Sequence, residues 1–314
     1  MSTQTLPQRD FTSGALPVAG MLVAVTAWGL GSILAKEVSV DGLTLSFYRL
    51  WFGSAVMLAI LLLVRHRPTV REFRLSAPAG AVFGINTVLG FTAIKITTVA
   101  DATLIGALQP ALVLLVAGSW FGESIGRPQI AWTAVSIVGI VILIAGASSS
   151  PEWSPLGDGL ALLGVLLFTG YFLASKRIRE SVSTVSFMFG VHIGAAAVVT
   201  PIALVHGLHP ADLPLSDLAR ILTIVFTSGV AAHMLINWAH PYVKVSVSSV
   251  LVLLTPVVAT MAAWAVLDES LTAIQAFGGV VTLVAIAALT RSSHGTDVPA
   301  TPITELPEPT IAGN

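Results

Sequence analysis

Residues 110–140 read PALVLLVAGSWFGESIGRPQIAWTAVSIVGI, and residues 256–286 read PVVATMAAWAVLDESLTAIQAFGGVVTLVAI. The two stretches share eight residues, each pair 146 positions apart: Pro110, Ala117, Glu123, Ser124, Gln129, Val135, Val138 and Ile140 recur as Pro256, Ala263, Glu269, Ser270, Gln275, Val281, Val284 and Ile286. A weaker match at an offset of 140 relates Lys36, Thr44, Ser46 and Phe47 to Lys176, Thr184, Ser186 and Phe187. A duplicated half, with a small change in the length of one connection, explains both offsets.

Long apolar stretches separated by short polar connections continue along most of the chain. Apolar residues make up 55% of the sequence and charged residues 10%, whereas soluble domains carry about 25% charged residues. About 20 apolar residues in a helix are enough to cross about 30 Å of hydrocarbon. The sequence therefore predicts an all-α membrane protein with ten transmembrane helices, at 15–35, 43–64, 76–95, 102–121, 129–147, 157–176, 184–206, 219–240, 247–266 and 272–290.

The distribution of Lys and Arg predicts how these spans are oriented. With the N-terminus in the cytoplasm, eleven basic residues fall on the cytoplasmic side, and only Lys36, Lys95 and Arg220 fall outside. The positive-inside rule then favours a multi-pass protein of the cell (plasma) membrane with both termini in the cytoplasm. Because each copy contains five spans, an odd number, the second copy must enter the membrane inverted relative to the first.

The repeat also predicts the division of the chain. We expect a cytoplasmic N-terminal tail at 1–14, a first repeat at 15–147, an outer linker at 148–156 and a second repeat at 157–290. The remaining residues, 291–314, are rich in Pro, Thr and Glu. Such a composition cannot bury enough apolar surface to fold, so this cytoplasmic tail is expected to be disordered.

Several classes of function lack the residues that they need. The chain has no cysteine, which excludes disulfides, thiol catalysis and thiolate metal sites. No histidine has metal-ligand spacing, and no glycine-rich phosphate loop is present, so no metal, nucleotide or other cofactor is predicted. We find no paired acid and base groups and assign no catalytic residue. The basic cluster at 65–74 is expected to face anionic lipid and not nucleic acid.

Each repeated proline lies inside a stretch that is predicted to cross the membrane. Proline removes a backbone hydrogen bond and clashes with the preceding turn, so Pro110 and Pro256 should kink the fourth and ninth spans near mid-membrane. The freed carbonyl groups need protein or water partners, which favours a position facing a cavity. The duplicated kinks are therefore predicted to act as hinges or gates, and a static bend for packing is the alternative.

Glu123 and Glu269 follow the two kinked spans, each with a serine beside it and a glutamine shortly after. This pattern predicts that each glutamate caps the next helix or braces its loop. The alternative is a carboxylate that reaches a mouth of the pathway.

A few polar side chains inside the spans are the candidates for binding a solute. Arg49 is the one fixed charge within a span. A structural role, by snorkelling or by binding backbone carbonyls, is the first interpretation, and pairing with a substrate carboxylate is the functional one. His192 and His233 could carry a proton or bind a solute, or could form hydrogen bonds between helices. Other candidates, which need hydrogen-bond partners, are Asn86, Gln109, Asn237 and Thr255.

The segments at 97–146 and 246–289 both resemble the end of an EamA domain, with proline, then glutamate, then a glycine-bearing final span. AWGLGSILAKEV in the first span, LSFYRLWFGSAV in the second and FTAIKITTVADA after the third fit the same family. The chain is thus similar, over about residues 18–290, to the ten-span EamA proteins of the drug/metabolite transporter superfamily.

This resemblance implies two inverted five-helix EamA repeats around a cavity lined by the first, third, fourth, sixth, eighth and ninth spans. It places Trp28 and Tyr171, together with Phe168, in an aromatic patch of that cavity, with helix packing or an interfacial belt as the alternative. An arginine at position 49 belongs to the family's common pattern. The small multidrug relatives carry a carboxylate in the first span that binds protons and cationic drugs, and this chain has no such group.

Together, these features predict a secondary transporter, and an exporter, that works by alternating access between its two repeats. The predicted solute is a small metabolite such as an amino acid or related zwitterion, with a hydrophobic drug or amine as the alternative. A membrane-embedded enzyme or sensor is the competing class. One ten-span chain can enclose a pathway, so a monomer in the lipid bilayer is sufficient for transport. A homodimer is the alternative.

Overall fold

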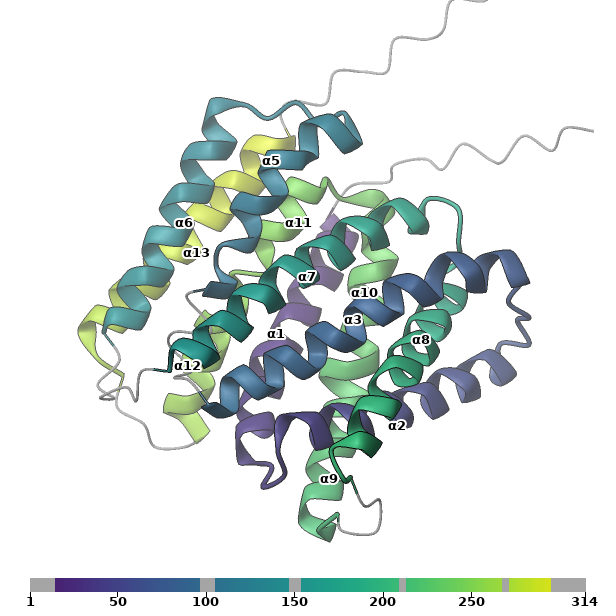
Figure 1. The fold of residues 1–314 in the computed structure, drawn as a ribbon. Coiled ribbons are helices and arrows are strands. Elements are labelled where there is room, and N and C mark those ends of the chain that lie inside the picture. The colour runs from purple at the N-terminus through teal and green to yellow at the C-terminus, as the bar shows by residue number, and fades with distance from the viewer. Residues whose placement is uncertain (1–14, 97–104, 147–153, 209–212, 267–270, 295–314) are drawn as a thin grey trace, which may run out of the picture.

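The computed structural model describes residues 15–96, 105–146, 154–208, 213–266 and 271–294 of the chain. All regular structure in these ranges is helical (Figure 1). The elements are α1 (Ala15–Glu37), α2 (Gly42–Leu63), α3 (Val70–Ile96), α5 (Gln109–Phe121), α6 (Arg127–Ala145), α7 (Pro155–Arg179), α8 (Thr184–Val205), α9 (Leu215–Ile224), the π-helix η2 (Val225–Ala231), α10 (Ala232–Ala239), the 3₁₀ turn η3 (His240–Tyr242), α11 (Val245–Leu251), α12 (Leu254–Val266) and α13 (Ala273–His294).

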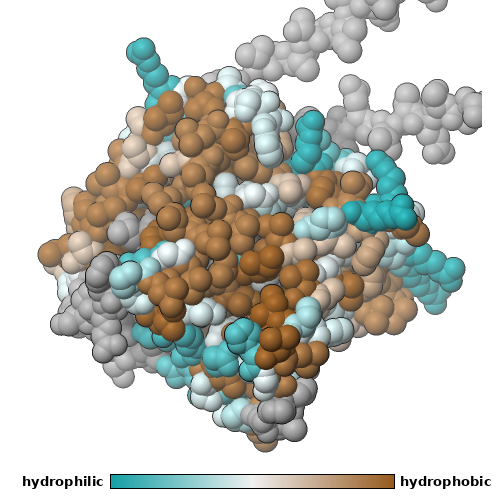
Figure 2. All heavy atoms as spheres, viewed as in Figure 1, coloured by the Kyte–Doolittle hydropathy of each residue, from teal (hydrophilic) through white to brown (hydrophobic). Residues whose placement is uncertain are grey.

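These helices correspond to the ten predicted spans. Nine segments of the described chain are long and apolar enough to cross a membrane, and the predicted fourth span contains the shorter apolar helix α5. Apolar side chains cover the middle of the face drawn in Figure 2, and polar side chains lie toward its edges. The predicted fold class, an all-α membrane protein of two inverted five-helix repeats, is confirmed.

The helices also extend into two segments that were predicted to lie outside the repeats, the outer linker and the C-terminal tail. Helix α7 begins at Pro155, inside the predicted linker 148–156, because the Ser154 hydroxyl accepts a hydrogen bond from the Gly157 amide at 3.1 Å and caps the helix there. Helix α13 continues to His294, so residues 291–294 are helical and do not begin a disordered tail. Glu269, the tail at 1–14 and residues 295–314 lie outside the described residues.

Short polar side chains determine where several spans begin. The Asp41 carboxylate accepts hydrogen bonds from the backbone amides of Leu43 (2.8 Å) and Thr44 (3.0 Å), which have no partner within the first turn of α2. Burial alone would raise the pKa of Asp41, but its hydrogen bonds with Thr44 and Leu43 outweigh that effect and lower the pKa. Ser183 caps α8 in the same way, through the Ser186 amide.

The fourth and ninth spans are interrupted next to their repeated prolines. Pro110 is the second residue of α5 and Pro256 the third residue of α12. Just ahead of each proline the backbone makes a tight turn, in which the Leu108 amide bonds the Ile105 carbonyl (3.1 Å) and the Thr255 amide bonds the Val252 carbonyl (3.0 Å). A proline cannot donate the helical hydrogen bond, so the regular helix ends and restarts at both places.

The eighth span is the least regular of the described spans. It was expected as one helix over 219–240, but a π-helix, η2, separates α9 from α10, and a 3₁₀ turn follows at His240–Tyr242. A π-helix widens the turn and is frequent at functional sites. It also presents backbone carbonyls to side chains that a regular α-helix would exclude.

Glycines allow two pairs of helices to pack with their backbones in close contact. A Cβ atom at Gly84 of α3 would lie 2.8 Å from the Ala195 carbonyl oxygen of α8, and one at Gly80 would clash with the Val191 carbonyl. In the same way, Gly139 of α6 faces α13. Small residues permit such close approach between transmembrane helices, so α3 packs closely on α8 and α6 packs closely on α13.

The buried apolar side chains form two clusters, and each contains residues from both repeats. One cluster joins α5, α6, α10, α11, α12 and α13 with parts of α1 and α7. Its largest buried side chains include Met21 of α1, Ile140 and Leu251. The other joins α2, α3, α8, α9 and η2, around Phe187 and Ile221. Helices α1 and α7 contribute to both clusters and therefore lie between them.

Candidate functional site

Arg49 lies deep within α2, where only 8% of the residue is exposed. Its guanidinium carbon is 5.8 Å from the ring centre of Phe83 and 5.5 Å from that of Phe91, so two aromatic rings of α3 face the charge. Its Nε is buried without a hydrogen-bond partner. The ion pairs among the described residues, Arg177–Glu180 and Arg220–Asp217, do not include it. Such a buried, unpaired charge within a span is costly.

The π-helix η2 brings a backbone carbonyl to this region. The Trp28 indole donates to the Ser228 carbonyl oxygen at 3.1 Å, and His233 Nδ1 lies 2.9 Å from the same oxygen. The Trp28 indole nitrogen also lies 3.3 Å from His233 Nδ1. His233 Nδ1 donates to the Ser228 carbonyl when it carries the proton and accepts from Trp28 when it does not. Gly229 follows Ser228, and a Cβ atom there would lie 3.5 Å from Arg49 Nε. The π-helix thus brings α1, α2 and α10 together.

Tyr171 and Asn237 complete the wall of this region. The Asn237 amide nitrogen lies 3.4 Å from the Tyr171 hydroxyl and donates to the His233 carbonyl at 2.8 Å, whereas its amide oxygen is buried without a partner. The Phe83 ring centre is 4.8 Å from that of Tyr171 and 5.0 Å from that of His233. We refer to Trp28, Arg49, Phe83, Tyr171, His233 and Asn237 as the Arg49 cluster.

The structure therefore brings five predicted site residues together, namely Trp28, Arg49, Tyr171, His233 and Asn237. His192 lies beside them and interacts electrostatically with Arg49. Its Nδ1 bonds the Met188 carbonyl at 2.8 Å, and its ring packs against Gly53. His192 thus has contacts that fit a structural role between α2 and α8.

The other three predicted polar residues lie elsewhere. Gln109 and Thr255 occupy equivalent positions in the two repeats, directly before Pro110 and Pro256. Both amide atoms of Gln109 and the Thr255 hydroxyl are buried without hydrogen-bond partners. Thr255 approaches α1 at Gly29, next to Trp28. Asn86 of α3 faces Gly164 of α7.

Glu123 caps a helix, but not the next one along the chain. Its carboxylate accepts hydrogen bonds from the Val245 amide (2.5 Å) and from the amide (3.2 Å) and hydroxyl (2.7 Å) of Ser246, at the start of α11 in the other repeat. The following helix, α6, is capped by Gln129, whose side-chain oxygen accepts from the Gly126 amide at 2.9 Å. The prediction that Glu123 caps the next helix along the chain is therefore wrong, because its partner is α11 and not α6.

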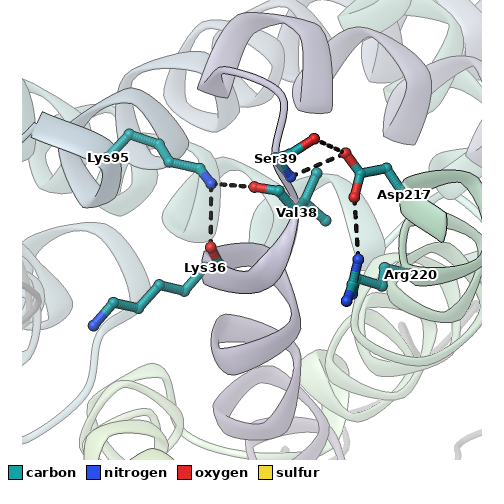
Figure 3. Close-up of polar contacts among 6 residues, drawn as sticks. All are labelled: Lys36, Val38, Ser39, Lys95, Asp217 and Arg220. Atoms are coloured by element: carbon teal, nitrogen blue, oxygen red, sulfur yellow. Dashed lines mark hydrogen bonds and ion pairs between the residues drawn. The ribbon is translucent and has the colours of Figure 1, made fainter. Parts of the chain in front are cut away.

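Several important residues were not predicted from the sequence. Phe83 and Phe91, which face Arg49, read as ordinary apolar residues of the third span. Ser228 and Gly229 gave no periodic signal for a π-helix. Asp217 was not singled out either, but it is 1% exposed and accepts from the amide (2.9 Å) and hydroxyl (2.5 Å) of Ser39 (Figure 3).

Comparison with known proteins agrees with this arrangement. The EamA-like transporter family matches residues 15–145 and 155–291, which are the two repeats. Over 273 residues, the chain is 25% identical to an uncharacterized transporter of Archaeoglobus fulgidus, a match that covers 85% of this chain and 94% of that protein. It is also 29% identical over 147 residues to the uncharacterized protein PA1977 of Pseudomonas aeruginosa, which covers 45% and 49% of the two chains.

A solved crystal structure of a protein is similar in fold. The match has a TM-score of 0.71 at 21% sequence identity and covers 90% of this chain and 99% of the other. At this identity the likeness concerns the fold alone. The two family matches together span both repeats, so this chain is a membrane transporter, not an enzyme, and belongs to the EamA-like transporter family of the drug/metabolite transporter superfamily.

Proposed function

We propose that this transporter exports a small metabolite that carries a carboxylate, such as an amino acid or related zwitterion. The observation that carries the proposal is the buried Arg49 guanidinium, which has no carboxylate partner among the described residues. A fixed positive charge inside a membrane protein is retained where it binds a counter-charge. A planar guanidinium can bind a carboxylate through two parallel hydrogen bonds.

The surroundings of Arg49 suit the rest of such a solute. Phe83, Tyr171 and Trp28 offer aromatic faces to an ammonium group or an apolar side chain. The Asn237 amide oxygen, which has no partner, can accept a hydrogen bond from an ammonium group. A lipophilic cation is a poorer fit, because Arg49 would repel it.

Alternating access would use the two apolar clusters as the moving bodies. Each cluster contains helices of both repeats, so the bodies that move do not coincide with the sequence repeats. The interruptions beside Pro110 and Pro256 lie within one of these bodies and could act as its hinges. The energy would come from the gradient of the solute, from exchange or from a proton gradient.

Flux measurements in liposomes test the proposed solute. Purified protein should move labelled neutral amino acids down their gradient, and unlabelled amino acids should compete. Arg49→Gln should abolish this flux, and Arg49→Lys should retain part of it, because a lysine keeps the charge but loses the paired hydrogen bonds. Arg71→Gln is the matched control, since Arg71 is an exposed arginine at the start of α3. Flux of lipophilic cations without flux of any amino acid would show that the proposed solute is wrong.

A further inference from the structure

The segment between the eighth and ninth spans is held by two charged side chains, one from α7 and one from the connection between α5 and α6. The Lys176 ammonium of α7 donates to the carbonyl oxygens of His240 (3.0 Å) and Val243 (2.5 Å). A few residues later, Glu123 accepts from the Val245 amide and from the amide and hydroxyl of Ser246. Glu123 and Lys176 also attract each other electrostatically. We call this arrangement the Glu123 clamp.

A second segment is held with the same chemistry, as Figure 3 shows. The Lys95 ammonium of α3 donates to the carbonyl oxygens of Lys36 (3.3 Å) and Val38 (2.5 Å), between the first and second spans. The carboxylate of Asp217, at the start of α9, accepts from the amide and hydroxyl of Ser39. We call this arrangement the Asp217 clamp.

The two clamps lie at opposite ends of the bundle. Successive spans run in opposite directions, so the ends of the fourth and sixth spans meet the start of the ninth at one end. At the other end of the bundle, the end of the third span and the start of the eighth span meet the end of the first span. In each clamp, an ammonium group holds two carbonyls and a carboxylate holds the amide and hydroxyl of a serine.

The two clamps differ in kind from the glycine-packed contacts of α3 with α8. Glycine contacts join backbones directly and cannot separate without opening a void. The hydrogen bonds of a clamp lie at a span end, where water can replace each of them when the helices part. The clamps are therefore contacts, one at each end, that can break and re-form.

The segment held by the Glu123 clamp also lies next to the Arg49 cluster and shares helices α7 and α10 with it. The Asn237 carbonyl oxygen accepts from Arg179 Nε at 2.9 Å, while the Asn237 side chain lies in the cluster beside Tyr171. Ser175 bonds His240 through its hydroxyl at 2.9 Å, one helical turn from Tyr171 on α7. A solute that moves Asn237 or Tyr171 would therefore change the position of the clamped segment.

We propose that the Glu123 and Asp217 clamps are the two gates of the transport pathway, and that the protein opens at the end whose clamp has been released. This inference rests on the alternating-access transport proposed above. Neutralising Glu123 removes the charge that holds α11, and neutralising Asp217 removes the charge that holds Ser39. Each change should shift the protein toward the state that is open at its own end.

Labelling of a single introduced thiol tests this proposal, because the natural chain contains no cysteine. The reporter is Thr255→Cys, because the Thr255 hydroxyl is buried without a partner and the Thr255 backbone approaches α1. A membrane-impermeant maleimide is added to sealed vesicles of each membrane orientation. A separate variant, Ser124→Cys, shows in which vesicles the Glu123 end faces the reagent. Glu123→Gln should raise labelling of the reporter from that end about tenfold, since one charged hydrogen bond is worth about that factor. Asp217→Asn should raise labelling from the opposite end.

Matched controls separate gating from a general loss of structure. Asp41→Asn removes a carboxylate that binds the backbone and hydroxyl of its own helix, and Glu180→Gln removes an exposed carboxylate near the Glu123 clamp; neither should change labelling. Ser246→Ala and Ser39→Ala remove one hydroxyl each and should produce smaller shifts in the directions given by Glu123→Gln and Asp217→Asn. These variants remain informative if the charge variants do not fold.

Equal labelling of the reporter in the parent and the clamp variants, including no labelling in any of them, would overturn the proposal that the clamps are gates. A rise in labelling from the same end in Glu123→Gln and Asp217→Asn would also overturn it. The assay contains no solute. A wrong choice of solute would therefore leave its result unchanged, and amino-acid flux without a shift in labelling would count against the clamps alone.

Discussion

At the scale of single residues, Arg49 combines a cost in stability with the role in binding that we propose for it. Its guanidinium is enclosed by Phe83 and Phe91, and its Nε has no hydrogen-bond partner. A structural arginine would be expected to bind backbone carbonyls or a carboxylate and to stabilise the fold. An unpaired arginine instead destabilises the empty protein and is stabilised when an anion binds.

This difference leads to a prediction about stability. Arg49→Gln should leave the melting temperature of the detergent-solubilised protein unchanged or raise it, because an unpaired buried charge is removed. A rise should correspond to a gain of about 1 kcal/mol or more in the free energy of unfolding. The neutral amino acids that raise the melting temperature of the parent should no longer do so in the variant. A large fall in melting temperature on Arg49→Gln would instead identify a structural arginine. Arg71→Gln is again the control.

At the scale of helices, close packing and interruption have opposite consequences. Helices α3 and α8 pack through glycine and alanine backbones and form a rigid pair. Helices α5 and α12 begin at the interruptions beside their prolines, where regular helical hydrogen bonds are missing. Rigid pairs transmit motion without deforming, and interruptions allow one half of a span to move relative to the other half.

Two glycines of α3 provide a direct test of the packing. Gly80→Ala should destabilise the protein by about 1–3 kcal/mol, because the new methyl group meets the Val191 backbone, which cannot move aside. Gly90→Ala lies on the same helix with nothing within 4 Å of the added carbon. It should leave the melting temperature unchanged or raise it, because alanine favours a helix more than glycine does. Similar losses in both variants would show that close packing is not the cause.

The repeated prolines provide a test of the interruptions. Pro110→Ala and Pro256→Ala restore a backbone donor and should extend the regular helix, so the melting temperature should hold or rise while the rate of solute flux falls. Pro155→Ala is the control, since Pro155 is the first residue of α7, where proline is well tolerated. Undiminished flux in the double variant would favour the static bend over the hinge.

At the scale of the whole molecule, two sequence repeats form two packed bodies that do not coincide with them. Each apolar cluster draws helices from both halves, and α1 and α7 contribute to both. The inverted repeat therefore describes how the chain enters the membrane. The packing describes which helices can move together.

The orientation of the whole molecule can be measured with introduced thiols. The excess of Lys and Arg predicts that the connection at 64–69 faces the cytoplasm and that the connection at 38–41 faces outward. In intact cells, an impermeant maleimide should label Glu37→Cys and should reach Arg67→Cys only after the membrane is permeabilised. A fluorescent protein fused to the C-terminus should fluoresce in the cytoplasm. The reverse labelling pattern would place both termini outside.

Much of the architecture could be predicted from the sequence because it depends on local properties. A span is recognised from the summed hydropathy of about 20 consecutive residues, and the repeat and its inversion follow from matching positions and an odd number of spans. The interruptions beside Pro110 and Pro256 follow from the missing amide of proline. The identity of the family follows from the same local patterns.

The contacts between distant segments were decided by the tertiary structure. Trp28 and Ser228 meet because α1 packs against a π-helix, and Glu123 finds α11 and not α6 as its partner helix. Asp217 becomes buried because Ser39 covers it. Hydropathy decides which segments enter the membrane, but every span is apolar enough to pack against several others. Only the shapes of the packed helices decide which backbone groups a buried polar side chain can reach.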